Sequence, residues 1–218
     1  MTMARIDDNG LLFSEPGDVL KVEHRLRTAN FGALRDPKPE ILIWHLTGNS
    51  IPHGANDAAH DGTQAMALRI FDGTARYYAH AYLGRDGVLW QVVPFTRAAI
   101  HVAGNWKGRE TNKISNGIEI TNAGWSHLDG KAPGFEVDPS RDDYRQHGCL
   151  LWQMLTAAQN TAVLELAEAW RLWTGAAVDD CLRGHHDVDT DSTHSDPGPD
   201  FRPLLLGPVK THLEAMTL

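Results

Sequence analysis

The arrangement of apolar residues along the chain predicts several strands of a β-sheet. Residues 41–44 are four consecutive apolar residues, Ile-Leu-Ile-Trp, a run typical of a strand that is buried on both faces. Residues 77–83 and 88–93 are rich in aromatic and β-branched side chains. Asp86-Gly87 lies between these two segments and suits a tight turn, so the two segments are predicted to form a hairpin.

Another strand is predicted at residues 117–121, where apolar and polar side chains alternate. The alternation places Ile118 and Ile120 on one face of the strand and Glu119 on the other. A carboxylate at the centre of a strand is either a solvated residue of a half-exposed sheet or a group with a chemical role. Local pattern alone does not choose between the two.

The C-terminal half of the chain changes to helical spacing. Apolar residues recur three and four positions apart over residues 147–174, which predicts one amphipathic helix that ends at Gly175. A short helix is predicted at residues 64–71 and a last short strand at residues 178–182. The order of elements predicts a single α/β domain, with a central mixed β-sheet flanked by helices.

The two ends of the chain carry weaker patterns. Residues 1–38 are predicted to be an irregular N-terminal leader, closed by the turn-rich segment Asp-Pro-Lys-Pro at residues 36–39. The predicted domain then spans residues 39–210, and residues 211–218 are predicted to be a tail.

Composition and charge exclude several classes of protein. The formal net charge of the 218 residues is −8, whereas nucleic-acid binding calls for a basic surface. No run approaches about 18 apolar residues, so no membrane span is expected. The first ten residues carry two acids and no apolar run, so no signal peptide is expected and the protein is predicted to be cytoplasmic as synthesised. Cys149 and Cys181 form no CxxC pair and are expected in the core.

Histidine, the commonest metal ligand, is unusually frequent, with 12 copies. His45 directly follows the apolar run, His185 follows the last predicted strand, and Asp196 lies in the next loop. Open α/β sheets place their sites at such strand ends. Two imidazoles and a carboxylate suit a catalytic zinc site, whose fourth position is left to water. Zinc lowers the pKa of that water to about 7. A lone histidine after a strand is more often structural, so only the combination favours a metal.

Five segments in the same order resemble motifs of the type 2 N-acetylmuramoyl-L-alanine amidases, a family related to the peptidoglycan recognition proteins and to phage amidase lysozymes. The resemblance runs over about residues 40–202. The segments are residues 41–47 (ILIWHLT), 80–87 (HAYLGRDG), 91–104 (QVVPFTRAAIHVAG), 116–120 (NGIEI) and 184–201 (GHHDVDTDSTHSDPGPDF). Each motif is weak alone, and their common order makes the resemblance specific.

The resemblance implies a zinc enzyme that hydrolyses the amide bond between N-acetylmuramic acid and L-alanine in peptidoglycan or muropeptides. It implies Zn2+ on His45, His185 and Asp196, and it makes Glu119 the carboxylate that positions and deprotonates the attacking water. His194 occupies the place where cytosolic members have a lysine, in a loop one residue longer than theirs. A histidine there stabilises the oxyanion when it is protonated or donates a hydrogen bond, which makes activity more dependent on pH.

The phage branch of the family has a catalytic tyrosine where this chain has Ala79, which leaves the general-base role to Glu119. The resemblance also places residues 105–112 beside the substrate cleft. Substrate-binding roles are predicted for His101, Trp106, Arg109 and Asn112. The Arg109 guanidinium offers a planar fork for a peptide-stem carboxylate.

Three of the histidines have competing interpretations. His101 either lines the cleft and hydrogen-bonds the substrate or has a structural role. His80 is expected to be a buried support of the site rather than a ligand. His186 would be a ligand only if the register were shifted by one residue.

Two other functions fit parts of the pattern. A peptidoglycan-binding module that has lost catalysis would typically lack one or more zinc ligands, and all the candidates are present here. A zinc hydrolase of an unrelated amide would share the ligand types but not the five ordered motifs. The predicted function is therefore the amidase. Intact cell wall and anhydro-muropeptides remain alternative substrates, and the oligomeric state is not indicated.

Overall fold

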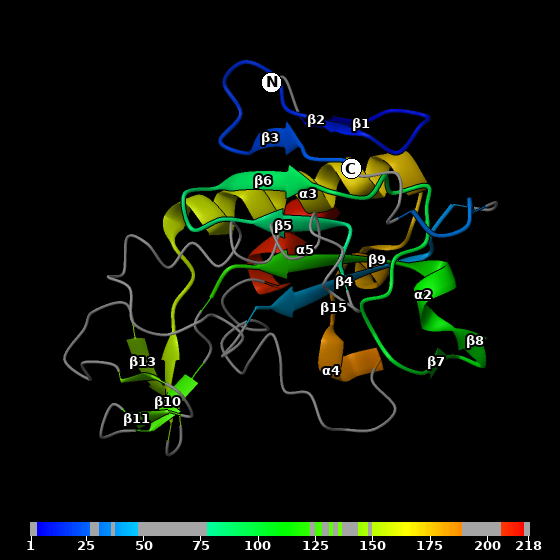
Figure 1. Cartoon of the computed structure of the whole chain (residues 1–218). Coiled ribbons are helices and arrows are strands. Elements are labelled where there is room, and N and C mark those ends of the chain that lie inside the picture. The colour runs from blue at the N-terminus through cyan, green and yellow to red at the C-terminus, as the bar shows by residue number, and fades with distance from the viewer. Residues whose placement is uncertain are drawn as a thin grey trace.

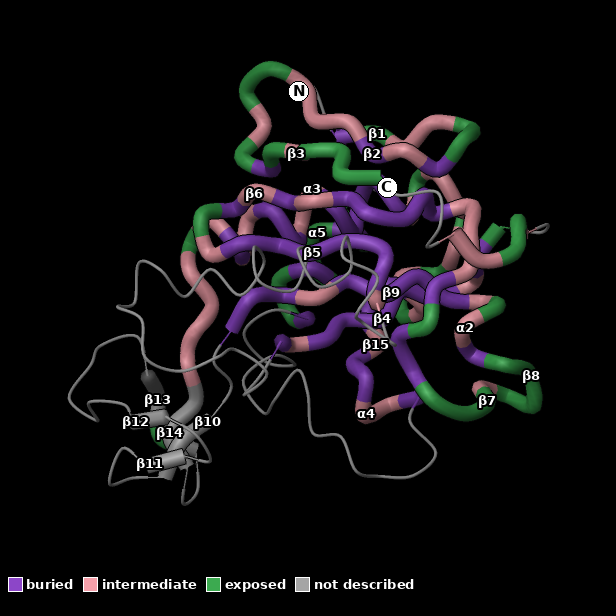
Figure 2. Tube along the Cα trace, in the orientation of Figure 1, coloured by how far each residue is buried: buried purple, intermediate pink, exposed green. Residues whose placement is uncertain are grey.

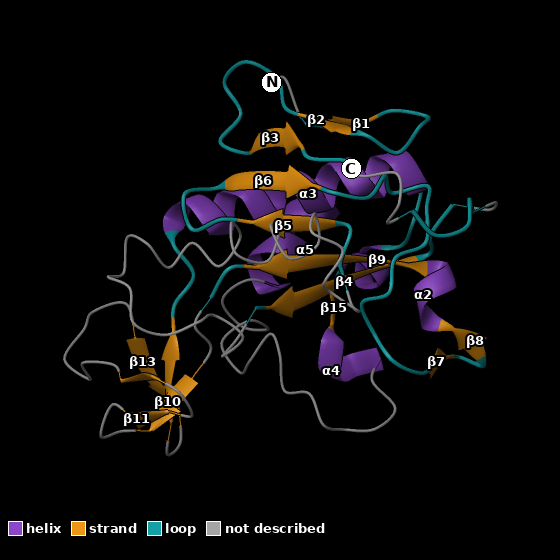
Figure 3. Cartoon of the chain, viewed as in Figure 1, coloured by secondary structure: helices purple, strands orange, loops and turns teal. Residues whose placement is uncertain are grey.

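The centre of the molecule is a six-stranded mixed sheet (Figure 1). The computed structural model describes residues 4–26, 31–35, 38–47, 78–122, 125–127, 131–132, 135–136, 144–147, 150–188 and 206–215. In spatial order the strands are β15 (Arg183–Gly184), β4 (Ile41–Leu46), β9 (Ser115–Ile120), β5 (Ala81–Leu83), β6 (Val88–Gln91) and β3 (Lys21–His24). Neighbouring strands run parallel except β5 and β6. The prediction of one α/β domain with a central mixed sheet and flanking helices is confirmed (Figure 3).

Strand β4 lies inside this sheet and is buried on both faces (Figure 2). Leu42 and Trp44 belong to the main hydrophobic core, to which helices α3 (Ala157–Thr174) and α5 (Gly207–Ala215) also contribute. Ile41 and Ile43 belong to a smaller cluster on the opposite face. Because side chains alternate along a strand, His45 projects from this second face, away from α3 and α5.

The predicted hairpin is confirmed by the antiparallel pair β5 and β6. Gly87 has a φ of +83°, which its side-chain-free backbone adopts without strain, and its N–H donates to the carbonyl of Gly84. The predicted strand around Glu119 is also confirmed, as β9. Ile118 and Ile120 are completely buried in the main core, while Glu119 is partly exposed. The helix predicted at residues 64–71 lies outside the described residues.

The predicted helix over residues 147–174 begins later than expected, at Ala157. A capping box causes this: the Thr156 hydroxyl accepts from the Gln159 N–H, and the Gln159 side chain accepts from the Thr156 N–H. The preceding residues form strands of a separate small sheet. Gly175, with a φ of +74°, ends the helix as predicted. The small sheet has the order β10 (Trp125–His127), β14 (Leu150–Gln153) and β13 (Tyr144–His147).

Removing the capping hydroxyl of this helix tests that account. Thr156→Ala is expected to lower the free energy of unfolding by about 1 kcal/mol, because the Gln159 N–H loses its acceptor. Thr161→Ala is the matched control, since the Thr161 hydroxyl donates to the Ala157 carbonyl one turn earlier, at the exposed surface. Urea unfolding of both variants measures the difference. Equal midpoints would show that the cap does not set the start of the helix.

The predicted irregular leader carries strands and belongs to the main structure. Its segment Lys21–His24 is the edge strand β3 of the central sheet, and Leu12 and Leu20 are completely buried in the main core. The predicted tail is also part of a helix, since α5 spans both sides of residue 211 and buries Val209 and Leu213. Both segments were missed because their apolar residues are too few to show a period. Two further strands of the leader pair with each other, β1 (Arg5–Ile6) and β2 (Leu12–Phe13).

The last strand, predicted at residues 178–182, is instead a 3-10 turn, η4 (Val178–Cys181), and pairing with β4 begins only at Arg183. The Trp44 indole N–H donates to the carbonyl of Cys181, which ties this turn to the sheet. Within the described part of the chain, no helix has both the length and the apolar character needed to span a bilayer. The remaining short elements are β7 (Asn105–Trp106), β8 (Arg109–Glu110), α2 (Thr111–Ile114), β11 (Lys131–Ala132), β12 (Phe135–Glu136) and α4 (His185–Val188).

Candidate active site

Three of the residues singled out in the sequence meet at one place on the second face of the sheet. His45 near the end of β4 is in register with Glu119 on the parallel strand β9. On the other side of β4, Gly184 is in register with Trp44, so His185 follows directly beside His45. Neighbouring strands lie about 4.8 Å apart and registered residues project to the same face. The three side chains therefore form a row across the ends of three strands.

The two histidines of this row face each other through the same ring atom. His45 Nδ1 lies 3.0 Å from His185 Nδ1, and the side chains are 2% and 7% exposed. Two nitrogen ligands of a tetrahedral zinc, each at 2.0–2.1 Å, lie about 3.3 Å apart. The convergence of two Nδ1 atoms at close to this spacing fits a shared metal ion.

The other predicted members of the site, Asp196 and His194, lie outside the described residues. Within the described ranges, no group of three or more histidine, cysteine, aspartate or glutamate side chains gathers as a metal site. His45 and His185 are thus two of the three ligands that the sequence predicts.

Glu119 lies at the β9 end of the row. It is partly exposed, in contrast to Ile118 and Ile120 on either side of it. Its register partner on the next strand is Tyr82, whose hydroxyl accepts a hydrogen bond from the Ala79 N–H at 3.2 Å. Burial, and next the charge of Glu119, raise the pKa of Tyr82 well above its ordinary value, so the phenol stays protonated. Glu119 is therefore a partly exposed carboxylate beside two buried histidines.

His101 lies behind His45, on the side away from His185. Its Nδ1 is 3.0 Å from His45 Nε2, and its Nε2 is 3.0 Å from the hydroxyl of Ser115. The His101 side chain is only 7% exposed. Burial, followed by the neighbouring His45, lowers the pKa of His101 well below its ordinary value, so the ring is neutral near pH 7.

His80 extends this row of rings further into the protein. Its ring centroid lies 5.6 Å from that of His101, and it is completely buried. The Nδ1 atom accepts from the Gly117 N–H at 3.0 Å, and Nε2 donates to the Arg97 carbonyl at 2.8 Å. Burial, then the charge of Arg35, lowers the pKa of His80 well below its ordinary value. His80 has both ring nitrogens bound to backbone, as expected of a support.

Asn112 holds the backbone of the segment that carries His101. Its side-chain oxygen accepts from the N–H groups of His101 and Val102 at 3.0 and 3.2 Å, and its amide N–H donates to the Val102 carbonyl at 2.7 Å. Both the oxygen and the nitrogen of the Asn112 amide are therefore bonded to the backbone of this loop. In this structure Asn112 holds the loop that carries His101, and its contact with substrate stays a prediction.

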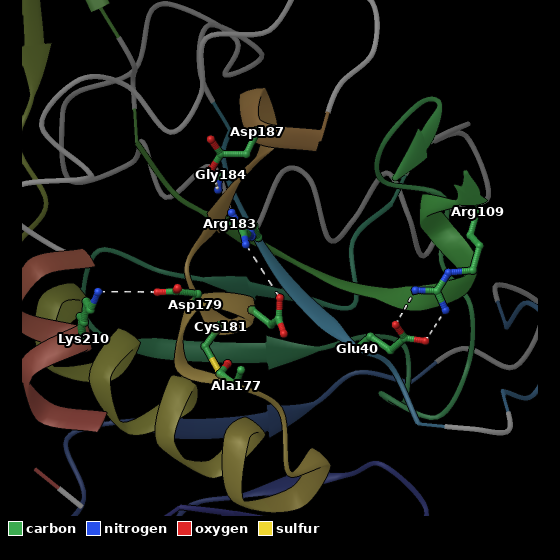
Figure 4. A network of polar contacts seen from close by, with 10 residues as sticks. Glu40, Arg109, Ala177, Asp179, Cys181, Arg183, Gly184, Asp187 and Lys210 are labelled. Atoms are coloured by element: carbon green, nitrogen blue, oxygen red, sulfur yellow. Dashed lines mark hydrogen bonds and ion pairs between the residues drawn. The ribbon is translucent and has the colours of Figure 1, made fainter. Parts of the chain in front are cut away.

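Arg109 lies far from the two histidines. Its guanidinium makes a two-pronged ion pair with the carboxylate of Glu40, the residue directly before β4, as Figure 4 shows. His45 is near the opposite end of that strand, about 16 Å further along at 3.3 Å per residue. A peptide stem that reaches Arg109 would have to extend along the strand and displace Glu40.

Trp106 lies between these two ends. It packs on the cluster of Ile41, Ile43, Val102 and Val188, and the Arg183 guanidinium lies 5.2 Å above its ring. Trp106 thus covers part of this face of β4 with an aromatic side chain.

The histidine next to His185 points elsewhere. His186 contacts Asp187 at 3.3 Å, and the other oxygen of Asp187 accepts from the Gly184 N–H at 2.8 Å (Figure 4). The bond to Gly184 fixes the turn from β15 into α4, which directs His185 to His45. The register with His185 facing His45 is therefore the one observed.

Two residues of the site were not singled out from the sequence. Ser115 is 14 positions from His101, and only the fold brings the two together. Gly117 lies directly under the His101 ring: a Cβ atom there would be 2.3 Å from His101 Nδ1. No local pattern marks a serine or glycine for such a contact.

A family model and several solved structures are similar to this chain. A family model described as N-acetylmuramoyl-L-alanine amidase matches residues 35–199. The structure is similar to that of AmpD, solved as its selenomethionine derivative, with a TM-score of 0.59 and 21% identity over 94% of this chain and 98% of that one. No curated protein sequence matches the chain.

Two other solved structures have the same fold. AmiD, an amidase from E. coli in complex with the substrate anhydro-N-acetylmuramic acid-L-Ala-D-γ-Glu-L-Lys, has a TM-score of 0.54 at 20% identity, over 94% of this chain and 65% of AmiD. A mutant endolysin from Bacillus subtilis has a TM-score of 0.53 at 16% identity, over 89% of this chain and 99% of the endolysin. At these identities the likeness establishes the fold.

Proposed function

Since this chain belongs to the N-acetylmuramoyl-L-alanine amidase family, we propose that it hydrolyses the amide bond between N-acetylmuramic acid and L-alanine with the help of a zinc ion. The observation that carries the proposal is the approach of His45 Nδ1 and His185 Nδ1 to 3.0 Å, with Glu119 in register beside them. The substrate is peptidoglycan or a muropeptide released from it. AmiD, which has the same fold, binds a muropeptide of this kind.

The proposed zinc ligands are His45, His185 and Asp196. The two histidines fit because both offer a Nδ1 atom to the same point, at a spacing close to that of two ligands of one tetrahedral ion. A zinc ion held by these residues would supply Lewis acidity and would favour the ionisation of water at neutral pH.

Glu119 has the position of a general base in this scheme. Its carboxylate is held on a central strand, next in register to His45, and is partly exposed on the face where the substrate binds. It would take the proton of the attacking water and return it to the L-alanine nitrogen as the amide bond breaks. His194 would be the donor that stabilises the charge on the carbonyl oxygen.

The apolar wall beside the row completes the proposed cleft. Trp106 would contact the glycan or the first residues of the stem, and Arg109 would bind a stem carboxylate only in exchange for Glu40. His101 and Asn112 lie behind the metal ligands and act on the substrate indirectly, through the position of His45.

The products of peptidoglycan digestion test the proposal. Mass spectrometry of the soluble fraction is expected to show free stem peptides that begin with L-alanine, and glycan strands without stems. Sedimentation of the protein with peptidoglycan without any released peptide would instead identify a binding module. Digestion of anhydro-muropeptides in parallel shows which of the two substrates the enzyme prefers.

A further inference from the structure

We infer that Ser115 and His101 form a hydrogen-bonded relay that fixes the ring proton of His45 on Nε2 and so aims its Nδ1 lone pair at the metal. The relay runs from the Thr111 carbonyl through Ser115 and His101 to His45. This inference rests on the proposed function in one respect, because it takes His45 to be a zinc ligand. It makes His101 and Ser115 positioning residues, in place of a substrate-binding role for His101.

The direction of each hydrogen bond in the relay follows from the bond between Ser115 and the Thr111 carbonyl. The Ser115 hydroxyl has one proton and gives it to the Thr111 carbonyl at 2.7 Å. The same oxygen lies 3.0 Å from His101 Nε2, so it accepts and Nε2 carries the proton. A neutral histidine has a single ring proton, so His101 Nδ1 is an acceptor. The proton between His101 Nδ1 and His45 Nε2 must then belong to His45.

This direction leaves the His45 Nδ1 atom unprotonated, which is the state that binds zinc. The opposite tautomer would place a proton on Nδ1, directly against the metal. Histidine ligands in zinc proteins usually donate their other N–H to an acceptor that fixes ring orientation and tautomer. A neutral imidazole is the acceptor for His45, and the serine ensures that this imidazole has its own proton on the far side.

The surrounding structure is shaped to hold the His101 ring in one orientation. The absence of a side chain at Gly117 makes space for the ring, since a Cβ there would lie 2.3 to 2.8 Å from three of its atoms. Asn112 fixes the backbone on the other side through the His101 N–H. The His101 ring is 7% exposed and Ser115 is completely buried, so bulk water does not compete for these bonds.

Zinc affinity of purified protein, measured by competition with a chromogenic chelator, tests the relay. His101→Leu removes the acceptor and is expected to weaken zinc binding about 10–100-fold. Ser115→Ala frees the His101 proton to move to Nδ1 and is expected to weaken binding about 10-fold, at the low end of that range. His101→Asn places a carbonyl oxygen where Nδ1 was and is expected to recover most of the affinity lost in His101→Leu. The control His24→Asn changes an exposed histidine on the far edge strand and should leave zinc affinity unchanged.

The tautomer itself is measured without zinc. Two-bond correlation of ring protons and nitrogens in the ¹⁵N-labelled apoprotein is expected to place the His45 proton on Nε2 in the wild type, and on both nitrogens in Ser115→Ala. A purely structural role of His101 would leave this spectrum of Ser115→Ala unchanged. Circular dichroism melting of each variant verifies that it is folded.

The outcomes separate this inference from the proposed function. Wild-type protein that binds zinc, with the expected order among variants but no cleavage of peptidoglycan, would support the relay and reject the amidase. A proton on His45 Nδ1 in the wild type, unchanged affinity in His101→Leu, or equal affinity of the Leu and Asn variants would overturn the relay. Wild-type protein that binds no zinc would also overturn it.

Discussion

Glu119→Gln is expected to lower kcat for release of stem peptides by about 10²–10⁴-fold, the usual contribution of a general base. The amide of glutamine has the same shape as the carboxylate but cannot take a proton from the attacking water. Zinc content should be unchanged, because the proposed zinc ligands are His45, His185 and Asp196 and not this residue. The measurement combines steady-state hydrolysis of a muropeptide with elemental analysis of the same preparation.

A matched control for this variant is Glu214→Gln. Glu214 is an exposed glutamate on α5, where it pairs with Lys210, and its loss should leave kcat unchanged. Full activity of Glu119→Gln would remove the general-base assignment and favour the interpretation of Glu119 as a solvated strand residue. Loss of zinc together with activity would instead show that this carboxylate is a ligand.

Substitution of His185 by alanine is expected to abolish activity and to weaken zinc binding by more than the 10–100-fold typical of residues behind the ligands. The variant removes one of the two Nδ1 atoms that face each other at 3.0 Å. His186→Ala is the neighbouring control, because its ring contacts Asp187 rather than His45. Zinc affinity by chelator competition compares the two variants directly.

This pair of variants also tests the register of the turn between β15 and α4. Zinc binding that survives in His185→Ala and is lost in His186→Ala would contradict the observed register. It would show that His186, one residue further along the chain, faces His45. The bond from the Gly184 N–H to Asp187, which fixes the turn, would then be absent from the zinc-loaded protein.

The parts of the site predicted from sequence are those with a strong local pattern. Four apolar residues before His45 identify a buried strand, and the alternation around Glu119 identifies its face. These two signals, together with the ordered motifs, predict two strands that carry the candidate site residues His45 and Glu119. The fold then supplies the contact between them, as β4 and β9 pair in register from Ile41 to Leu46.

Contacts between distant segments could not be predicted in this way. Ser115 and His101 meet only because the loop after β6 folds back over β9, and Gly117 matters only because of the ring that lies above it. Arg109 was interpreted as a substrate ligand because arginine suits carboxylates, and the structure shows that Glu40 of the same chain already occupies it. The charge of an arginine predicts that it pairs with a carboxylate, but it does not predict which carboxylate lies near it in the fold.

The errors in secondary structure have similar causes. The apolar residues over 147–174 continue the helical spacing into residues that pair as strands, and the capping box at Thr156 decides where the helix begins. Residues 1–38 lack a period because they add one edge strand and a few core side chains to a sheet built by the rest of the chain. Their stability comes from tertiary contacts, which a local pattern does not report.

The central claim, zinc-dependent amide hydrolysis at the row of His45, Glu119 and His185, is tested most directly by titrating zinc into the metal-free protein. Protein stripped by a chelator is mixed with increasing zinc, and the release of peptides that begin with L-alanine is measured at each step. The account predicts no release without zinc, a linear rise and a plateau at one zinc per chain. Full release of peptides by the stripped protein would contradict the account. So would protein that binds one zinc per chain and still releases no peptide.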